Sequence, residues 1–115
     1  MREILFRGKP IDEETIIGND FYYGDLCHYP NGEVTIRQPE TGYEMAVVPE
    51  TVGQFTGFTD INGMKIFEGD KLGGGIVVYD EHYCAFLIDF PHRSKKMYFE
   101  NIVRIEVTGN IHDNS

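Results

Sequence analysis

Turn-forming residues interrupt this chain at short intervals, and their spacing limits the fold more than any other feature of the sequence. The 115 residues include 13 glycines, which fall between short apolar runs. Asn-Gly pairs stand at Asn31-Gly32 and Asn62-Gly63 between apolar segments, and this dipeptide is the strongest short-range signal of a β-hairpin. Because no segment has the pattern of a helix longer than about two turns, the sequence predicts many short strands joined by tight turns.

Strands are expected where aromatic, β-branched and other apolar residues run between the turn signals. In the first half these runs cover residues 2–8, 21–29, 33–38 and 43–48. In the second half they cover residues 55–59, 65–70, 76–79 and 84–90, with one or two further strands within residues 97–115. Pro49 is placed to open a single helical turn that Gly53 ends, and residues 9–20, 60–64 and 91–96 are expected as polar loops or turns. The pattern is typical of an all-β sheet or a small barrel.

The chain is strongly acidic, with 10 basic and 19 acidic side chains and a net charge of −9. A charge of this sign does not attract phosphate backbones, so nucleic acid is not an expected partner, whereas a basic protein would be attracted. The N-terminus lacks the apolar segment of a signal peptide, and no apolar run approaches the roughly 20 residues of a membrane helix. We therefore expect a cytoplasmic protein that does not contact a membrane.

Two cysteines, Cys27 and Cys84, lie far apart and belong to no CxxC motif. Both have aromatic or aliphatic neighbours, so buried free thiols in a reducing cytoplasm are expected, with a Cys27–Cys84 disulfide as the alternative. Because Cys84 precedes the apolar run 85–88, we expect it at a buried position of a strand. That position argues against a reactive thiol or a metal cluster formed with His82.

Several stretches of the sequence resemble the YopX family. The most specific is residues 49–70 (PETVGQFTGFTDINGMKIFEGD), and residues 1–12, 22–26 (YYGDL), 77–90 and 105–115 are also similar. The chain departs from the family at Phe21 and Tyr22, where a tryptophan is frequent, and at Lys71-Leu72, where two aliphatic residues are frequent. The resemblance implies a phage- or prophage-encoded protein of unknown biochemical function, and a C-terminal half built as a small SH3-like barrel.

The expected architecture combines these two lines of reasoning. The fold is predicted to be mainly β, with at most one or two short helical turns. A short-stranded N-terminal sheet is expected over residues 1–55 and an SH3-like barrel over residues 56–115, and the two could pack as one unit. The Glu-Gly-Asp sequence that ends at Asp70, followed by an apolar strand and a hairpin, is typical of such barrels, because the Gly-Asp pair begins a strand at a tight bend.

No catalytic residue, metal site or cofactor is predicted from the motifs. The glycine run 73–75 leads into a strand and presents no helix N-terminus to a phosphate, so it is expected as a turn. Asp60 and Asn62 supply only the first half of a calcium loop, and Gly63 arrives too early for one. Asp70 and Asp80 are expected to cap or kink strands. We therefore do not expect an enzyme, although a small enzyme is kept as a second alternative.

Surface chemistry is left as the source of function. Exposed aromatic side chains could form a groove for a protein partner, as they do in peptide-binding barrels. The candidate interaction surface comprises Tyr22, Tyr23, Tyr79, Tyr83, Arg93, Lys95, Lys96 and Tyr98. The prediction is a non-enzymatic protein–protein interaction module in the host cytoplasm, which could also form homo-oligomers through exposed strand edges. The alternative is a nucleic-acid-associated accessory protein or an acidic DNA mimic.

Overall fold

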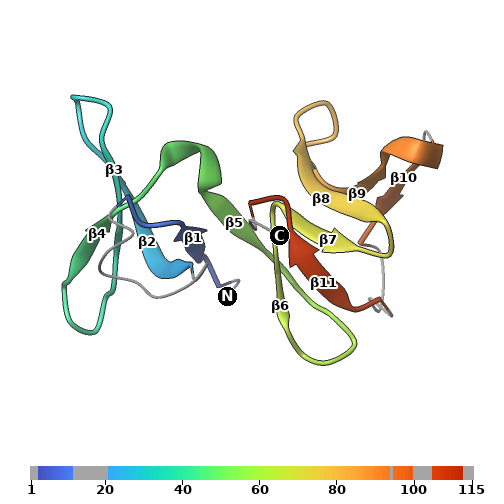
Figure 1. Ribbon diagram of the computed structural model, residues 1–115, viewed down its shortest axis with the longest axis horizontal. Coiled ribbons are helices and arrows are strands. Elements are labelled where there is room, and N and C mark those ends of the chain that lie inside the picture. Colours follow the sequence, from blue (N-terminus) through green and yellow to red (C-terminus); the bar gives the residue numbers. More distant parts are fainter. Residues whose placement is uncertain (1–2, 12–20, 94, 100–104, 113–115) are drawn as a thin grey trace. The chain divides into compact units, whose positions relative to one another are not determined.

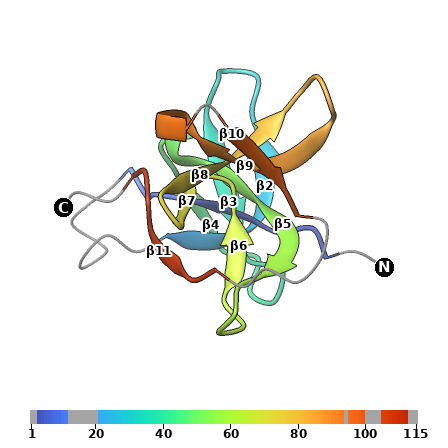
Figure 2. The ribbon, with the colours of Figure 1, turned by 90° about the vertical axis from the view of Figure 1, so that its right-hand side faces the viewer.

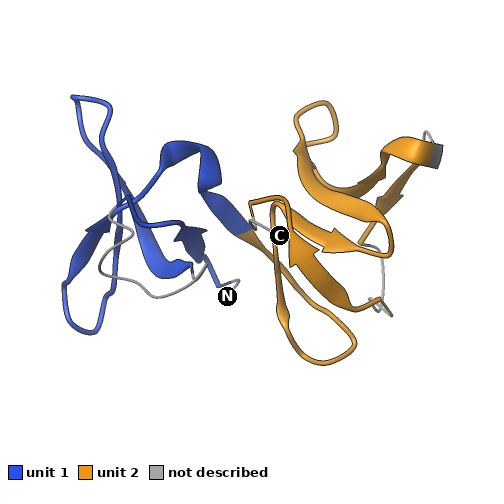
Figure 3. Cartoon of the chain, in the orientation of Figure 1, with its two compact units in different colours: residues 1–54, 114 blue, residues 55–113, 115 orange. Residues whose placement is uncertain are grey.

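The chain divides into two compact units, Met1–Gln54 and Phe55–Asp113 (Figures 1 and 3). The computed structural model describes residues 3–11, 21–93, 95–99 and 105–112. Within these residues the regular elements are short antiparallel strands and two single turns of 3-10 helix, η1 (Pro49–Thr51) and η2 (Pro91–Arg93). The prediction of a mainly β fold with at most two short helical turns is therefore confirmed. The described residues form no helix that is long and apolar enough to cross a membrane.

Unit 1 contains the first strands of an antiparallel sheet in the order β4-β3-β2-β1-β5, in which β5 also pairs with a sixth strand, β6. Its strands are β1 (Phe6–Gly8), β2 (Tyr22–His28), β3 (Val34–Arg37), β4 (Glu44–Ala46) and the first residues of β5 (Gly53–Thr59). All of these strands were expected from the sequence, with ends that differ by a few residues. The loop expected over residues 9–20 falls mostly on residues 12–20, which lie outside the described part of the chain.

The Asn31-Gly32 pair forms the predicted hairpin turn between β2 and β3. Gly32 has a φ of +90°, and its N–H group donates a hydrogen bond of 3.0 Å to the carbonyl of Tyr29. The turn places Leu26 opposite Ile36 in the pairing of the two strands. Ile36 is fully buried, and the small core of unit 1 forms around it together with Val34 and Val47.

Unit 2 contains a five-stranded antiparallel sheet in the order β10-β9-β8-β7-β11. Its strands are β7 (Asp70–Leu72), β8 (Gly75–Asp80), β9 (Ala85–Phe90), β10 (Lys95–Tyr98) and β11 (Val107–Asn110), while β6 (Lys65–Phe67) pairs with β5. The turn of the β8–β9 hairpin projects away from β7 (Figures 1 and 2). One face of the sheet carries the core of the unit, which comprises Ile66, Leu72, Val77, Ile88, Phe90 and Phe99.

The SH3-like barrel is not confirmed. The five-stranded sheet ends at β10 on one side and at β11 on the other, and these two strands are not paired within the described residues. The prediction of a single strand over residues 65–70 is wrong, because the chain turns at Gly69, which has a φ of +96°. This turn separates β6 from β7, and the buried Asp70 carboxylate caps it by accepting a hydrogen bond of 2.8 Å from the N–H group of Phe67. Asp70 therefore begins a strand at a tight bend, as predicted.

The glycine run 73–75 has two distinct structural roles. Gly73 and Gly74 have φ values of +55° and +87° and form the tight turn between β7 and β8, so the predicted turn is confirmed. Gly75 instead lies against the core. An ideal Cβ atom at this position would be 2.5 Å from Cγ2 of Ile88 and 2.9 Å from the ring of Phe90.

We expect Gly75→Ala to lower the free energy of unfolding by about 1–3 kcal/mol, because a methyl group here overlaps the buried side chains of Ile88 and Phe90. Urea unfolding followed by circular dichroism measures the change. Lys71→Ala, at an exposed position of the neighbouring β7, is the control and should leave the midpoint almost unchanged. An unchanged midpoint for Gly75→Ala would show that the core can repack around the added carbon.

Asp60 joins the β5–β6 turn to the C-terminal strand. One carboxylate oxygen accepts hydrogen bonds of 2.8 Å from the N–H groups of Asn62 and Met64, and the other accepts one of 2.9 Å from the N–H group of Val107. The side chain is only 5% exposed. The Val107 N–H group, followed by those of Met64 and Asn62, holds the pKa of Asp60 below its ordinary value. The turn over residues 60–64 was expected from the sequence, whereas the bond from Asp60 to β11 was not.

Asp60→Asn should detach β11 while it preserves the turn. The amide oxygen can still accept from Asn62 and Met64, but its NH₂ group then faces the Val107 N–H group, and two donors repel. We expect a loss of about 1–3 kcal/mol in the free energy of unfolding and faster amide hydrogen exchange within β11. Asp25→Asn, at an exposed position of β2, is the control with the same change of charge.

Candidate functional site

The β8–β9 turn is held by the side chain of Asp80. Its Oδ1 atom accepts hydrogen bonds of 2.8 Å from the N–H group of His82 and 3.1 Å from that of Tyr83. Such a bond from an aspartate to the backbone two residues further on favours a turn, and the expected capping role of Asp80 is confirmed. Cys84 completes the turn with a φ of +51°, and β9 begins at Ala85.

The buried strand position predicted for Cys84 is wrong. The side chain is exposed, and residues 81–84 form the hairpin turn, so the apolar run begins only after Cys84. Cys27 is half-buried, and both cysteines are free thiols rather than partners in a disulfide. Within the described ranges, no group of three or more His, Cys, Asp or Glu side chains could hold a metal ion.

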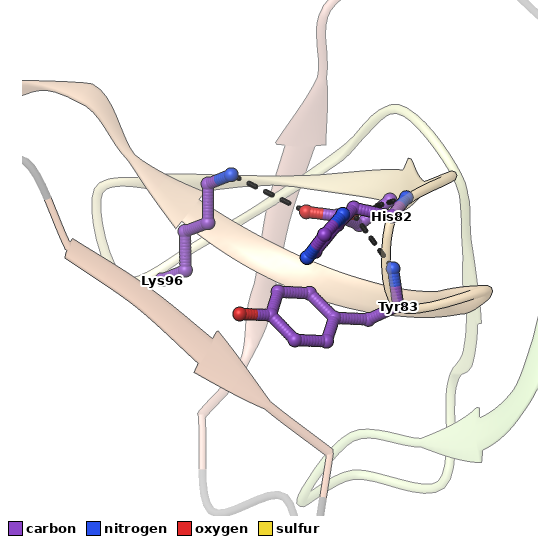
Figure 4. A network of polar contacts seen from close by, with 4 residues as sticks. His82, Tyr83 and Lys96 are labelled. Atoms are coloured by element: carbon purple, nitrogen blue, oxygen red, sulfur yellow. Dashed lines mark hydrogen bonds and ion pairs between the residues drawn. The ribbon is translucent and has the colours of Figure 1, made fainter.

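Lys96 reaches back across the sheet to the turn. Its Nζ atom lies 3.3 Å from Oδ2 of Asp80 (Figure 4). The side chain of Lys96 is 55% exposed, but that of Asp80 is only 10% exposed. The N–H group of Tyr83, the Lys96 ammonium and the N–H group of His82 hold the pKa of Asp80 below its ordinary value, so the carboxylate is charged at neutral pH.

Aromatic rings stand beside this ion pair. The rings of Tyr83 and Tyr98 are 5.8 Å apart and almost perpendicular, with an interplanar angle of 89°. The His82 ring meets Tyr83 edge-on at 4.7 Å. Tyr83 is 58% exposed and Tyr98 is 40% exposed. We call the group formed by Asp80, His82, Tyr83, Lys96 and Tyr98 the hairpin site.

Strand alternation explains why Lys96 and Tyr98 contribute to the site. Lys96 pairs with Asp89 and Tyr98 with Leu87, so these side chains lie on the sheet face opposite Val77 and Ile88. Leu87 lies on the same face as Lys96 and Tyr98, and it is fully buried although the core cluster of unit 2 gathers around Val77 and Ile88 on the other face. The hairpin site therefore lies on the face of the sheet that points away from the unit 2 core.

The structure brings together only part of the predicted interaction surface. Tyr83, Lys96 and Tyr98 meet at the hairpin site. Tyr79 and Lys95 belong to the opposite face of the same sheet, where the Tyr79 ring contacts Phe86 edge-on at 5.2 Å. Lys95 and Lys96 were expected in the loop over residues 91–96. They lie instead in β10, because the chain after β9 makes only the single turn η2 before the next strand begins.

Three predicted surface residues fall elsewhere. Tyr22 and Tyr23 lie in β2 of unit 1, where the Tyr22 ring is 6.2 Å from that of Tyr43 and the Tyr23 ring is 6.4 Å from that of Phe21. Partial burial raises the pKa of Tyr22, and Tyr23 is exposed. Arg93 is the last residue of η2, and its side chain lies outside the described part of the structure.

The sequence did not indicate that Asp80 and His82 belong to the site. Asp80 was identified only as a capping residue, and His82 was considered only as a partner for Cys84. The spacing of Asp80 two residues before His82 is the signal for the turn, and it could have placed His82 and Tyr83 at its tip. The contact with Lys96 depends on the pairing of β10 with β9, which no local pattern reveals.

Acidification should open the hairpin site. Because the pKa of Asp80 is lowered in the folded chain, its bonds are complete above the ordinary value of 3.8 and are lost as the pH falls through the lower folded value. An NMR titration of the His82 and Tyr83 amides should therefore show a midpoint below 3.8. A midpoint at or above 3.8 would mean that the carboxylate gains nothing from these partners.

The comparisons with known proteins agree with the resemblance found in the sequence. The family model described as YopX protein matches residues 6–115. No curated protein matches the chain, and no solved structure matches it. The matched residues run through both units and include the whole hairpin site. The resemblance is therefore confirmed over nearly the full length.

Proposed function

Since the chain belongs to the YopX family, we propose that it is a phage-type protein that acts by binding another protein and catalyses no reaction. The observation that carries the proposal is the exposed pair of perpendicular tyrosine rings at the hairpin site. Tyrosine is enriched at binding hot spots, because it offers a large apolar surface and a polar hydroxyl at low cost in conformational entropy. The rings are held by an anchored turn and a strand, which reduces the entropy lost on binding.

The charge of the chain supports a protein partner over nucleic acid. The net charge is −9, and the Lys96 ammonium is already paired with Asp80. The Asp80 carboxylate beside this lysine would repel a phosphate group that approached it. The same negative charge is also compatible with a protein that mimics DNA and so binds a DNA-binding protein.

An electrophoretic shift assay with duplex DNA at low and high salt tests the alternative of a nucleic-acid-associated accessory protein. Binding of DNA at low salt would favour that alternative over a protein partner.

The proposal includes three finer points. Unit 2 is built as an SH3-like barrel. The strand order supports this point, because β7, β8, β9 and β10 are neighbours in sequence order and β11 returns to lie beside β7. The protein acts in the cytoplasm of the host cell. It also forms homo-oligomers, supported by the position of β10 at the edge of the described sheet with all of its residues exposed. Light scattering coupled to size-exclusion chromatography tests the last point.

We expect the double variant Tyr83→Ser/Tyr98→Ser to lose the partner. Tagged wild-type and variant proteins are used to capture proteins from extracts of an infected or lysogenic host, and quantitative mass spectrometry compares what each retains. A partner that depends on the hairpin site should fall by about tenfold or more, because removal of aromatic anchors typically costs about 2 kcal/mol each.

Tyr79→Ser is the matched control, since it removes an exposed tyrosine from the opposite face of the same sheet. Circular dichroism verifies that each variant folds. The proposal is wrong if the double variant retains every protein that the wild type retains. It is also wrong if Tyr79→Ser causes the same loss, because the effect would then not depend on the hairpin site.

A further inference from the structure

We infer that the hairpin site recognises a basic side chain, an arginine or a lysine, presented by a basic protein partner. The incoming cation takes the place that the chain's own Lys96 ammonium now occupies beside Asp80. This inference rests on the proposed function and names the chemistry of the partner. It follows from the anchored carboxylate, the aromatic rings beside it, the weak hold on Lys96 and the charge of the whole chain.

The carboxylate is prepared to accept a cation. Oδ1 of Asp80 is engaged by the N–H groups of His82 and Tyr83, which fixes the side chain in the turn. Oδ2 faces the Lys96 ammonium at 3.3 Å, so the structure itself shows a cation at this atom. The site therefore has a fixed negative charge whose orientation does not depend on Lys96.

The tyrosine rings add a second source of attraction. Aromatic faces attract cations when the charged group lies within about 6 Å of the ring centre. Partial burial, followed by the neighbouring Tyr83, raises the pKa of Tyr98, so the phenol is neutral at physiological pH. The perpendicular rings of Tyr83 and Tyr98 expose differently oriented surfaces, and Figure 4 shows Tyr83 and His82 on the side of the turn from which Lys96 approaches.

Lys96 is an occupant that can be displaced. More than half of its side chain is exposed, and an ion pair with such a partner contributes little to stability. An ammonium group is a compact point charge, whereas a guanidinium group is planar and can stack on an aromatic ring while it donates to a carboxylate. An arginine of the partner can therefore stack on a tyrosine ring while it donates to Asp80, which the Lys96 ammonium cannot do. The displaced Lys96 side chain then regains conformational entropy.

The charge of the whole chain selects the same kind of partner. With a net charge of −9, the protein attracts basic surfaces over long distances and repels acidic ones. Attraction of this kind raises the rate of association, while contacts at a defined site provide specificity. The hairpin site would give a basic partner a defined docking point on an otherwise acidic molecule.

The test uses NMR titrations of the isotope-labelled full chain with a neutral-ended peptide, acetyl-Gly-Arg-Gly-amide. We expect shifts centred on the amides of His82, Tyr83 and Lys96, and none comparable with acetyl-Gly-Gln-Gly-amide. Lys96→Met removes the internal competitor and should tighten binding about two- to fivefold. Lys95→Met changes the charge equally on the opposite face of β10 and should not tighten binding to that extent.

Asp80→Asn should abolish the localised shifts. Its amide oxygen can still accept from the turn, so the fold is expected to persist, and Asp25→Asn is the control with the same charge change. Equal affinities of the Lys96→Met and Lys95→Met variants, or shifts scattered over the chain, would overturn the inference. If the peptide titrations give such a result while capture of a host protein still depends on Tyr83 and Tyr98, the proposed function stands and only the recognition of a basic side chain is wrong. If the double variant also captures every protein that the wild type captures, both proposals are wrong.

Discussion

Aspartate side chains bonded to nearby backbone N–H groups are the interaction on which unit 2 depends. Asp60, Asp70 and Asp80 stand at three of its turns, and each carboxylate accepts at least one backbone hydrogen bond there. Short strands have few ladder bonds, so the turns must fix their direction and register. The same three groups also account for part of the acidic charge of the chain, which is thus partly structural. The hairpin site forms around the turn that Asp80 holds, and β10 contributes the Lys96 ammonium group and the Tyr98 ring.

The sequence predicted what is local and failed where structure depends on pairing. The Asn31-Gly32 turn, the glycine turn before β8 and the capping aspartates follow from backbone preferences of a few residues. Cys84 was misplaced because its apolar neighbours suggested a strand, while the strand begins one residue later. The hairpin site could be predicted only in part, since Asp80 and Lys96 meet through the register of β10 against β9. Periodicity alone does not contain that register.

Membership of the YopX family and the geometry of the hairpin site limit function in different ways. The family match covers both units and supports a phage-type protein, but it names no ligand. The geometry names a chemistry, because a fixed carboxylate beside tyrosine rings discriminates between cations and neutral groups. The two fit together if the protein recognises a basic surface of another protein and performs no reaction there. Function would then depend on a few side chains at one turn of unit 2.

Strand β5 has a consequence for how the chain could be divided. Gly53 and Gln54 pair with β1 in unit 1, whereas Phe55 and Thr59 pair with β6 in unit 2. A protease or a gene truncation that cuts at the boundary would leave each fragment with an unpaired or shortened strand end. Evolution could therefore exchange either half only by supplying the same strand again. The contacts of the chain therefore gather into two bodies that are joined by one shared strand.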